Sequence, residues 1–260
     1  MENNSFGKII EVIDTLTGPQ GCPWDKKQTP LSMCDYLVEE CFELVEAIRM
    51  NDPAEVAEEL GDVLFLLLFI GRAMDREIPD FLQEAVDANV TKMIRRHPHV
   101  YGEKAASVAE VVRNWEQIKK LEKAEKEKDP GVFASLPASL PPLLRAYRIN
   151  SKAARAGFTW ATDEDQALKL QEEWQELQEA LEGGDEAARE EEFGDYLFSL
   201  VEYGRRRGIK ANSALALANA KFLKRFEAVE GLAAERGLDL DRLSLAEMDR
   251  LWDEVKTAGK

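Results

Sequence analysis

The stretch LVEECFELVEAI, residues 37–48, decides the fold of this chain, because it sets three glutamates into an apolar pattern of helical period. Its apolar residues form one stripe along a helix, and Glu40 and Glu43 flank one edge of that stripe. A second stretch, EELGDVLFLLLFI at residues 58–70, again places carboxylates at the start of an apolar run. Both stretches predict helices of a bundle whose carboxylates lie at the border between surface and core.

The composition bounds the class of protein. The 260 residues are 45% hydrophobic and 32% charged, which is enough for two globular domains that each bury a core. The formal net charge of −16 argues against a general nucleic-acid binder, because phosphate backbones are bound by basic surfaces. It does not exclude a small phosphorylated ligand that is held through metal cations.

The sequence also favours a cytoplasmic protein without a membrane span. The start of the chain lacks the pattern of a signal peptide, and the longest apolar run, residues 63–70, is too short to cross a bilayer. The three cysteines, Cys22, Cys34 and Cys41, have no CxxC spacing, so we expect them to be reduced thiols.

The chain is predicted to be all-α, since no window alternates with period two for long enough to suggest a strand. Asp52-Pro53 and Ser244-x-x-Glu247 are typical helix starts. Helices are expected over residues 5–17, 32–50, 53–74, 80–96, 108–127, 142–156, 164–182, 186–206, 211–236 and 245–256.

Self-comparison indicates that the chain contains one unit twice. Glu39-Glu40-x-x-Glu43 recurs as Glu172-Glu173-x-x-Glu176, and Glu59-x-Gly61-Asp62 recurs as Glu192-x-Gly194-Asp195, both at an offset of 133. Other landmarks keep their order at offsets between 129 and 137: Trp24 and Trp160, Lys92 and Lys221, Trp115 and Trp252. We therefore expect two helical-bundle domains, residues 1–129 and 142–260, joined by a proline-rich linker at 130–141.

The doubled carboxylate motif predicts a metal site in each half. Residues three apart on a helix project from the same side, and four converging carboxylates would repel one another without a compensating cation. Oxygen ligands suit Mg²⁺, or Mn²⁺, better than zinc, and the Glu-x-x-His pairs of di-iron bundles are absent from the sequence. For any single pair, a solvated acidic face is the alternative. The expected ligands are Glu40, Glu43, Glu59 and Asp62 in the first half, and Glu173, Glu176, Glu192 and Asp195 in the second.

Basic helix residues could bind the phosphates that such a metal attracts. The candidates are Lys92, Arg95 and Arg96 in the first half and Lys221, Lys224 and Arg225 in the second, although charge balance on a helix surface would explain them equally well. The sequence has neither a GxxxxGK[ST] loop nor a GxGxxG loop. Trp115 and Trp252 occupy matched places in polar terminal helices and could stack on a base, whereas core packing is the default for a tryptophan.

These motifs resemble those of the all-α nucleoside triphosphate pyrophosphohydrolases, and in combination those of the MazG family. Glu-Glu-x-x-Glu followed about twenty residues later by Glu-x-x-Asp is the signature, and GCPWD, ELGD, RRHPHV and WEQIK extend the likeness over nearly the whole chain. The resemblance implies Mg²⁺-dependent hydrolysis of a nucleoside triphosphate to monophosphate and diphosphate, as house-cleaning of (d)NTP pools. It also implies a homodimer built from helical bundles.

The resemblance further implies site residues, and it makes the second copy the principal hydrolytic one. The expected catalytic residues are Glu172, Glu173, Lys221 and Arg225. The expected nucleotide contacts are Lys169, Glu172, Arg189, Glu190, Glu191, Asp195, Lys221, Phe222, Arg225 and Trp252. Tyr36 stands in the first half where Lys169 stands in the second, so the first phosphate clamp is altered.

Two other functions remain open on the residues alone. A phosphohydrolase with the same metal site could remove only the terminal phosphate and release a nucleoside diphosphate. A helical adaptor could bind nucleotide or protein without turnover. In the hydrolase hypothesis Glu172 orients or deprotonates the attacking water, while Lys221 and Arg225 neutralise the leaving diphosphate.

Overall fold

The computed structural model describes residues 5–102 and 131–258 and a few positions between these ranges: Ser107, Glu110, Val111, Asn114, Trp115, Ile118 and Glu122. The helix expected over residues 108–127 therefore falls largely outside the described residues. Within the described residues every regular element is helical, as predicted, and no strand is present. None of the helices in this part of the chain is both long and apolar enough to cross a bilayer.

The chain divides into two compact units, residues 1–126 and residues 127–260. Lys152 on the first helix of the second unit donates hydrogen bonds to the Val132 carbonyl oxygen at 3.3 Å and to Ser135 Oγ at 2.9 Å. The segment expected to be a linker, residues 130–141, is thus attached to the second unit. The domain limits proposed from sequence stay a prediction.

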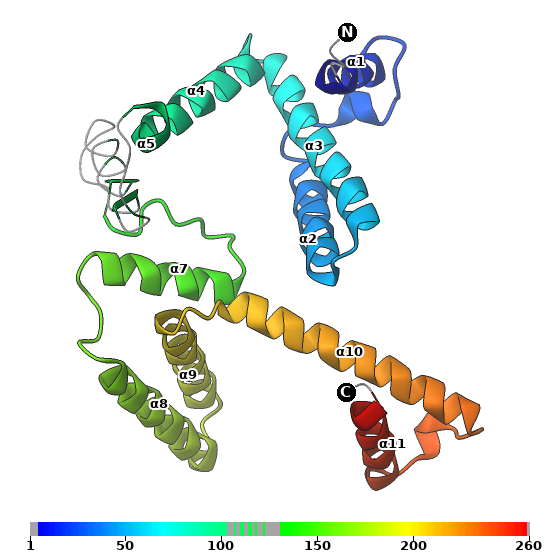
Figure 1. Ribbon diagram of the computed structural model, residues 1–260, viewed down its shortest axis with the longest axis vertical. Helices are drawn as coiled ribbons and strands as arrows, with labels where there is room; N and C mark the ends of the chain where they lie inside the picture. Colours follow the sequence, from blue (N-terminus) through cyan, green and yellow to red (C-terminus); the bar gives the residue numbers. More distant parts are fainter. Residues whose placement is uncertain are drawn as a thin grey trace. The chain divides into compact units, whose positions relative to one another are not determined.

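The first unit is built on a helical hairpin (Figure 1). The antiparallel helices α2 and α3 pack along each other, while α1 and α4 pack on α3. The elements are α1 (Ser5–Thr17), η1 (Asp25–Lys27), α2 (Cys34–Met50), α3 (Pro53–Asp75), α4 (Phe81–Arg96) and α5 (Pro98–Tyr101). Ile13, Met33, Leu66 and Phe69 form the buried core of this unit.

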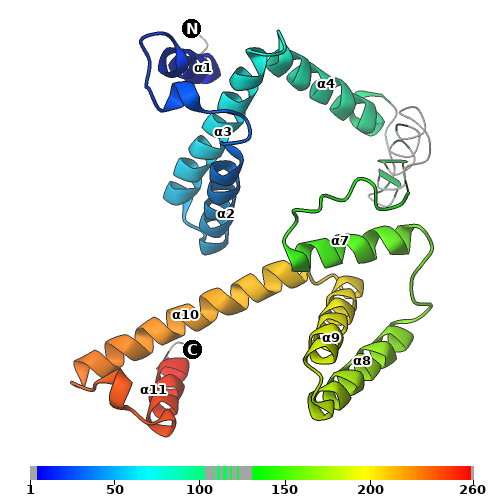
Figure 2. The same cartoon turned by 180° about the vertical axis from the view of Figure 1, so that it is seen from behind.

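The second unit repeats the hairpin and adds a long helix. Helices α8 and α9 lie side by side in both views (Figure 1 and Figure 2), and α10 leaves the end of α9 with α11 packed against its far half. The elements are α7 (Pro142–Arg155), α8 (Asp163–Gly183), α9 (Glu186–Arg206), α10 (Ala211–Glu235), η2 (Leu240–Arg242) and α11 (Leu245–Ala258). Val229, Ala233 and Leu251 form the buried cluster between α10 and α11.

The same turn chemistry closes both hairpins. Asn51 (φ 56°) and Gly184 (φ 81°) take the left-handed conformation that ends a helix, and the next residue caps the following helix. The Asp52 side chain accepts hydrogen bonds from the amides of Ala54 and Glu55, and Asp185 accepts one from Ala187. The start predicted at Asp52-Pro53 is therefore confirmed, and the offset of 133 also holds for the turn.

The structure corrects two expectations about the helices. The predicted ends of the helices within the described residues are right to within two residues, but the short elements α5, η1 and η2 were not expected. The apolar run that follows Asp62 is only partly buried, since Leu67 is 50% exposed within the chain. The first unit thus leaves apolar surface on its own hairpin.

Candidate active site

The second hairpin brings together carboxylates that are distant in sequence. Helix α8 carries Glu173, and α9 carries Glu192 and Asp195; one oxygen of each lies within 4.8 Å of the others. Packing of α8 against α9 buries Glu173 almost completely, whereas Asp195 is exposed. Glu176, the fourth expected ligand, lies beside this group and acts on Glu192 electrostatically. The three carboxylates of this cluster can offer oxygen ligands to a hard cation.

A lysine of the same helix sits against these carboxylates. Lys169 Nζ lies 2.8 Å from a carboxylate oxygen of Glu172, 3.0 Å from one of Glu173 and 3.7 Å from one of Glu176. These hydrogen bonds, first to Glu172 and then to Glu173, raise the pKa of Lys169. Sequence reasoning placed Lys169 among the phosphate contacts and missed these ion pairs, although the i, i+3 and i, i+4 spacing was a signal for them.

The first hairpin repeats the carboxylate cluster without the lysine. Oxygens of Glu40, Glu43 and Glu59 lie within 4.8 Å of one another, and Asp62 contributes to the electrostatics of Glu40. Among the residues that the structure describes, no ion pair reaches these carboxylates. Tyr36, at the position of Lys169, instead meets Trp24 edge to face at 5.9 Å.

The crowding of the carboxylates raises the pKa of several of them. Burial, and then the charges of Glu43 and Asp62, raise the pKa of Glu40 to about 7. Burial and the charge of Glu43 also raise the pKa of Glu59. In the second half, burial and the charges of Glu176 and Asp195 raise the pKa of Glu192. Each cluster therefore favours a bound positive charge.

The residues fit a divalent cation of the Mg²⁺ type. The donor set of each cluster is all oxygen, which such ions prefer. In the second cluster a cation, the ammonium of Lys169, already lies 3.0 Å from Glu173. In the first cluster, a groove of about 370 Å³ lined by Glu43, Glu59 and other hairpin residues leads to the carboxylates.

The expected nucleotide contacts divide into two groups. Lys169, Glu172, Arg189, Glu190, Glu191 and Asp195 lie on α8 and α9 with the carboxylates, and the Nε of Arg189 is buried without a hydrogen-bond partner in the described structure. Lys221, Phe222 and Arg225 lie on α10, and Trp252 lies on α11. No ion pair or hydrogen bond between described residues joins the second group to the carboxylates of the first.

The second group is an aromatic and basic cluster. The ring of Phe222 lies 5.2 Å from that of Trp252 at 42°, and the Arg225 guanidinium lies 6.0 Å from the Trp252 ring. The Phe222 side chain is half exposed, and Lys221 is exposed beside it. An exposed ring next to cations can stack a base and bind phosphate.

The basic residues of the first half are used differently from what we expected. Arg95 and Arg96 each form an ion pair with Glu122, at 2.6 Å in both cases. These hydrogen bonds, led by that from Arg96, lower the pKa of Glu122 to about 2. Two of the three cations of the candidate phosphate clamp are therefore held by an acidic partner that sequence reasoning missed.

Fold and site together define an all-α protein of two helical units, each with a carboxylate cluster on its hairpin. The family model of the MazG nucleotide pyrophosphohydrolase domain matches residues 28–101 and again residues 161–229. The chain therefore belongs to the MazG family.

Curated relatives agree with this assignment. The chain is 38% identical over 257 residues to the nucleoside triphosphate pyrophosphohydrolase of Escherichia coli K12, covering 97% of each chain. It is 37% identical to the nucleoside triphosphate pyrophosphohydrolase/pyrophosphatase MazG of Thermotoga maritima, covering 96% of this chain and 95% of that protein. A solved structure, a mazG-related protein from Thermotoga maritima, matches 44% of this chain and 98% of its own with 29% identity and a TM-score of 0.40.

Proposed function

We propose that this chain hydrolyses nucleoside triphosphates to nucleoside monophosphates and diphosphate, with Mg²⁺ bound at the second carboxylate cluster. Family membership makes it a hydrolase of phosphoric anhydrides, and the full-length relatives carry the name nucleoside triphosphate pyrophosphohydrolase. The observation that carries the proposal is the convergence of Glu173, Glu192 and Asp195 within 4.8 Å on the second hairpin. Removal of unwanted nucleotides from (d)NTP pools is the role we propose for it.

Glu173, Glu192 and Asp195, with Glu176 beside them, would hold the ion. Mg²⁺, or Mn²⁺, supplies charge compensation for a triphosphate and lowers the pKa of a water when it is bound. The carboxylates would hold the ion at the junction of α8 and α9, where Glu173 is nearly buried. Because the Glu173 side chain is nearly buried, it has few alternative positions, and it would therefore define where the ion binds.

Other side chains supply orientation and charge. Glu172 is exposed next to the cluster and can accept a proton from the attacking water. Lys221 and Arg225 can neutralise the charge that develops on the leaving diphosphate, and the rings of Phe222 and Trp252 can stack the base. In this proposal Lys221, Arg225 and Phe222 would contact the nucleotide from α10, and Trp252 from α11.

We further propose that the chain acts as a homodimer. Large apolar side chains lie exposed on the second hairpin, among them Leu168, Leu181 and Phe193, each more than half exposed. Contiguous apolar surface on helices is normally covered by a partner, and pairing of hairpins would complete a four-helix bundle. Sedimentation equilibrium tests this proposal, and a monomeric mass at micromolar concentration would contradict it.

The test of the activity is a panel of nucleoside triphosphates with Mg²⁺, with products separated by anion exchange. The wild type is compared with Glu173→Gln and with the matched variant Glu40→Gln of the first cluster. We expect monophosphate and diphosphate from the wild type, and a loss of at least about 100-fold in Glu173→Gln.

The other outcomes identify the alternatives. Loss in Glu40→Gln alone would place hydrolysis in the first half. Nucleoside diphosphate and inorganic phosphate as products would show that only the terminal phosphate is removed. Nucleotide binding without turnover would favour an adaptor.

A further inference from the structure

The two copies of the hairpin differ by one cation in the same carboxylate frame. Lys169 precedes Glu172, Glu173 and Glu176 by three, four and seven residues, and Tyr36 precedes the matching glutamates by the same intervals. Lys169 contacts all three carboxylates, at 2.8, 3.0 and 3.7 Å. The Tyr36 ring is turned to Trp24.

Glu173 is the residue that connects this lysine to the cation site. Its carboxylate belongs to the cluster with Glu192 and Asp195 and at the same time accepts a hydrogen bond from Lys169. A divalent ion bound by Glu173 would lie close to the ammonium, and two cations at such distances repel each other. The affinity of the second cluster for a divalent ion is therefore reduced while Lys169 keeps its present contacts.

A bound triphosphate would offer the Lys169 ammonium an alternative set of negatively charged partners. Its side chain is 29% exposed and ends a flexible four-carbon stem, so the ammonium can exchange carboxylate for phosphate oxygens without refolding the helix. A triphosphate offers several negative oxygens, whereas free Mg²⁺ or Mn²⁺ offers none. Of these ligands, only the nucleotide can replace the ion pair that Lys169 loses when its ammonium leaves Glu173.

We propose that Lys169 is a resident counter-ion of the second cluster, which holds divalent-cation affinity low until a triphosphate draws the lysine away. Cation and nucleotide then bind the second site together, while the first cluster, with Tyr36, binds a cation without nucleotide. The inference rests on the proposed function, because it presumes that the carboxylates bind a divalent ion. By linkage, the nucleotide must strengthen cation binding by the same factor as the cation strengthens nucleotide binding.

The test measures binding of Mn²⁺ alone to the full-length chain, by the electron paramagnetic resonance signal of the free ion. Second-site binding is isolated in a Glu40→Gln background, with and without Lys169→Met. First-site binding is isolated in a Glu173→Gln background, with and without Tyr36→Lys, which creates the spacing of the second copy in the first. Circular dichroism checks that each variant is folded.

We expect Lys169→Met to tighten nucleotide-free Mn²⁺ binding at the second site by about tenfold, the value of one charge-assisted hydrogen bond. Tyr36→Lys should weaken binding at the first site by a similar factor. An α,β-methylene triphosphate, which cannot be cleaved at that linkage, should tighten Mn²⁺ binding in the Lys169 protein far more than in Lys169→Met.

Two results would overturn the inference, and they are distinguishable. Unchanged or weaker Mn²⁺ binding in Lys169→Met, with Mn²⁺ bound by both proteins, would reject the counter-ion role alone. Absence of Mn²⁺ binding in every background, with or without the analogue, would reject the proposed metal site and this inference with it.

Discussion

Oxygens of Glu40 on α2 and Glu59 on α3 lie within 4.8 Å of each other across the first hairpin, and a hydrogen bond between the two carboxyl groups is among the causes that raise the pKa of Glu40. Two carboxyl groups can form such a bond only when one of them carries a proton. The raised pKa of Glu40, about 7, caused by burial and then by the charges of Glu43 and Asp62, provides that proton near neutral pH. Binding of a divalent cation, as proposed for such a cluster, would therefore release a proton from Glu40.

This exchange predicts a pH dependence of stability in the absence of divalent ions. Because the pKa of Glu40 is higher in the folded protein than its ordinary value of 4.5, the stabilisation is complete below about pH 4.5 and is lost as the pH rises through about 7. In EDTA, the melting temperature of the wild type should fall between pH 5 and pH 8. Glu40→Gln, whose amide donates without a titrating proton, should show a flatter profile.

Mg²⁺ provides the control for this prediction. At pH 8 it should restore the melting temperature of the wild type by a few degrees, and that of Glu40→Gln by less, because one ligand is gone. Parallel profiles for the two proteins in EDTA would contradict the role given to Glu40.

Replacement of Trp252 should affect nucleotide binding more than turnover. Stacking on an aromatic ring contributes about 1–3 kcal/mol per base, so Trp252→Leu should raise KM by about tenfold or more with a smaller change in kcat. Trp252→Phe keeps a ring next to Phe222 and should stay close to the wild type. Equal effects of the two substitutions would argue against stacking. Steady-state kinetics with a purine triphosphate measures both constants, and melting curves show whether the α10–α11 packing survives.

The ion pairs of Glu122 should stabilise the first unit in a pH-dependent way. Charge-assisted hydrogen bonds from Arg95 and Arg96 lower the pKa of Glu122 to about 2, so their contribution is complete above about pH 4.5 and is lost as the pH falls through about 2. Glu122→Gln should therefore cost about 1 kcal/mol at pH 7 and progressively less below pH 4. Urea unfolding at several pH values checks this, and a constant difference down to pH 3 would contradict it.

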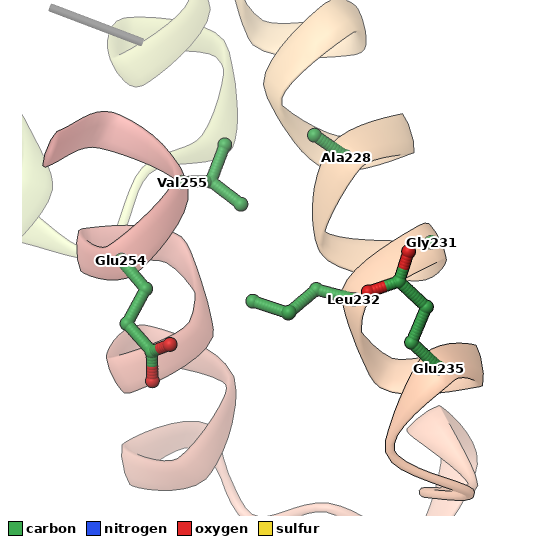
Figure 3. Close-up of a pocket in the computed structure, with 6 residues that line it drawn as sticks. All are labelled: Ala228, Gly231, Leu232, Glu235, Glu254 and Val255. Carbon is green, nitrogen blue, oxygen red and sulfur yellow. The ribbon is translucent and has the colours of Figure 1, made fainter. Parts of the chain in front are cut away.

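Packing rather than charge should hold α11 on α10. Figure 3 shows Leu232 and Val255 pointing toward each other across the groove of about 430 Å³ between the two helices, with Glu254 on the same turn as Val255. Glu254 hydrogen-bonds to Arg236, but both side chains are well exposed, so Glu254→Gln should leave stability nearly unchanged. Because Leu251 is buried, Leu251→Ala should lower the free energy of unfolding by about 2–4 kcal/mol. A larger loss in Glu254→Gln than in Leu251→Ala would reverse this order.

The sequence by itself determined the features that depend on local periodicity. Helical spacing of apolar residues, capping residues such as Asp52 and the offset of 133 predicted the helices, their starts and the duplication. The i, i+3 pairs Glu40 and Glu43, and Glu59 and Asp62, indicated carboxylates on one side of each helix. These predictions hold because a helix places residues three and four apart together whatever surrounds it.

Only the tertiary structure decided which of these side chains meet. It brought Glu173 of α8 to Glu192 and Asp195 of α9 and left Glu176 beside them. Such choices depend on how two helices pack and on the balance of charge between them, and neither is encoded in the spacing of a single helix. The sequence alone therefore named candidate residues for the site, and helix packing decided which of their carboxylates lie together.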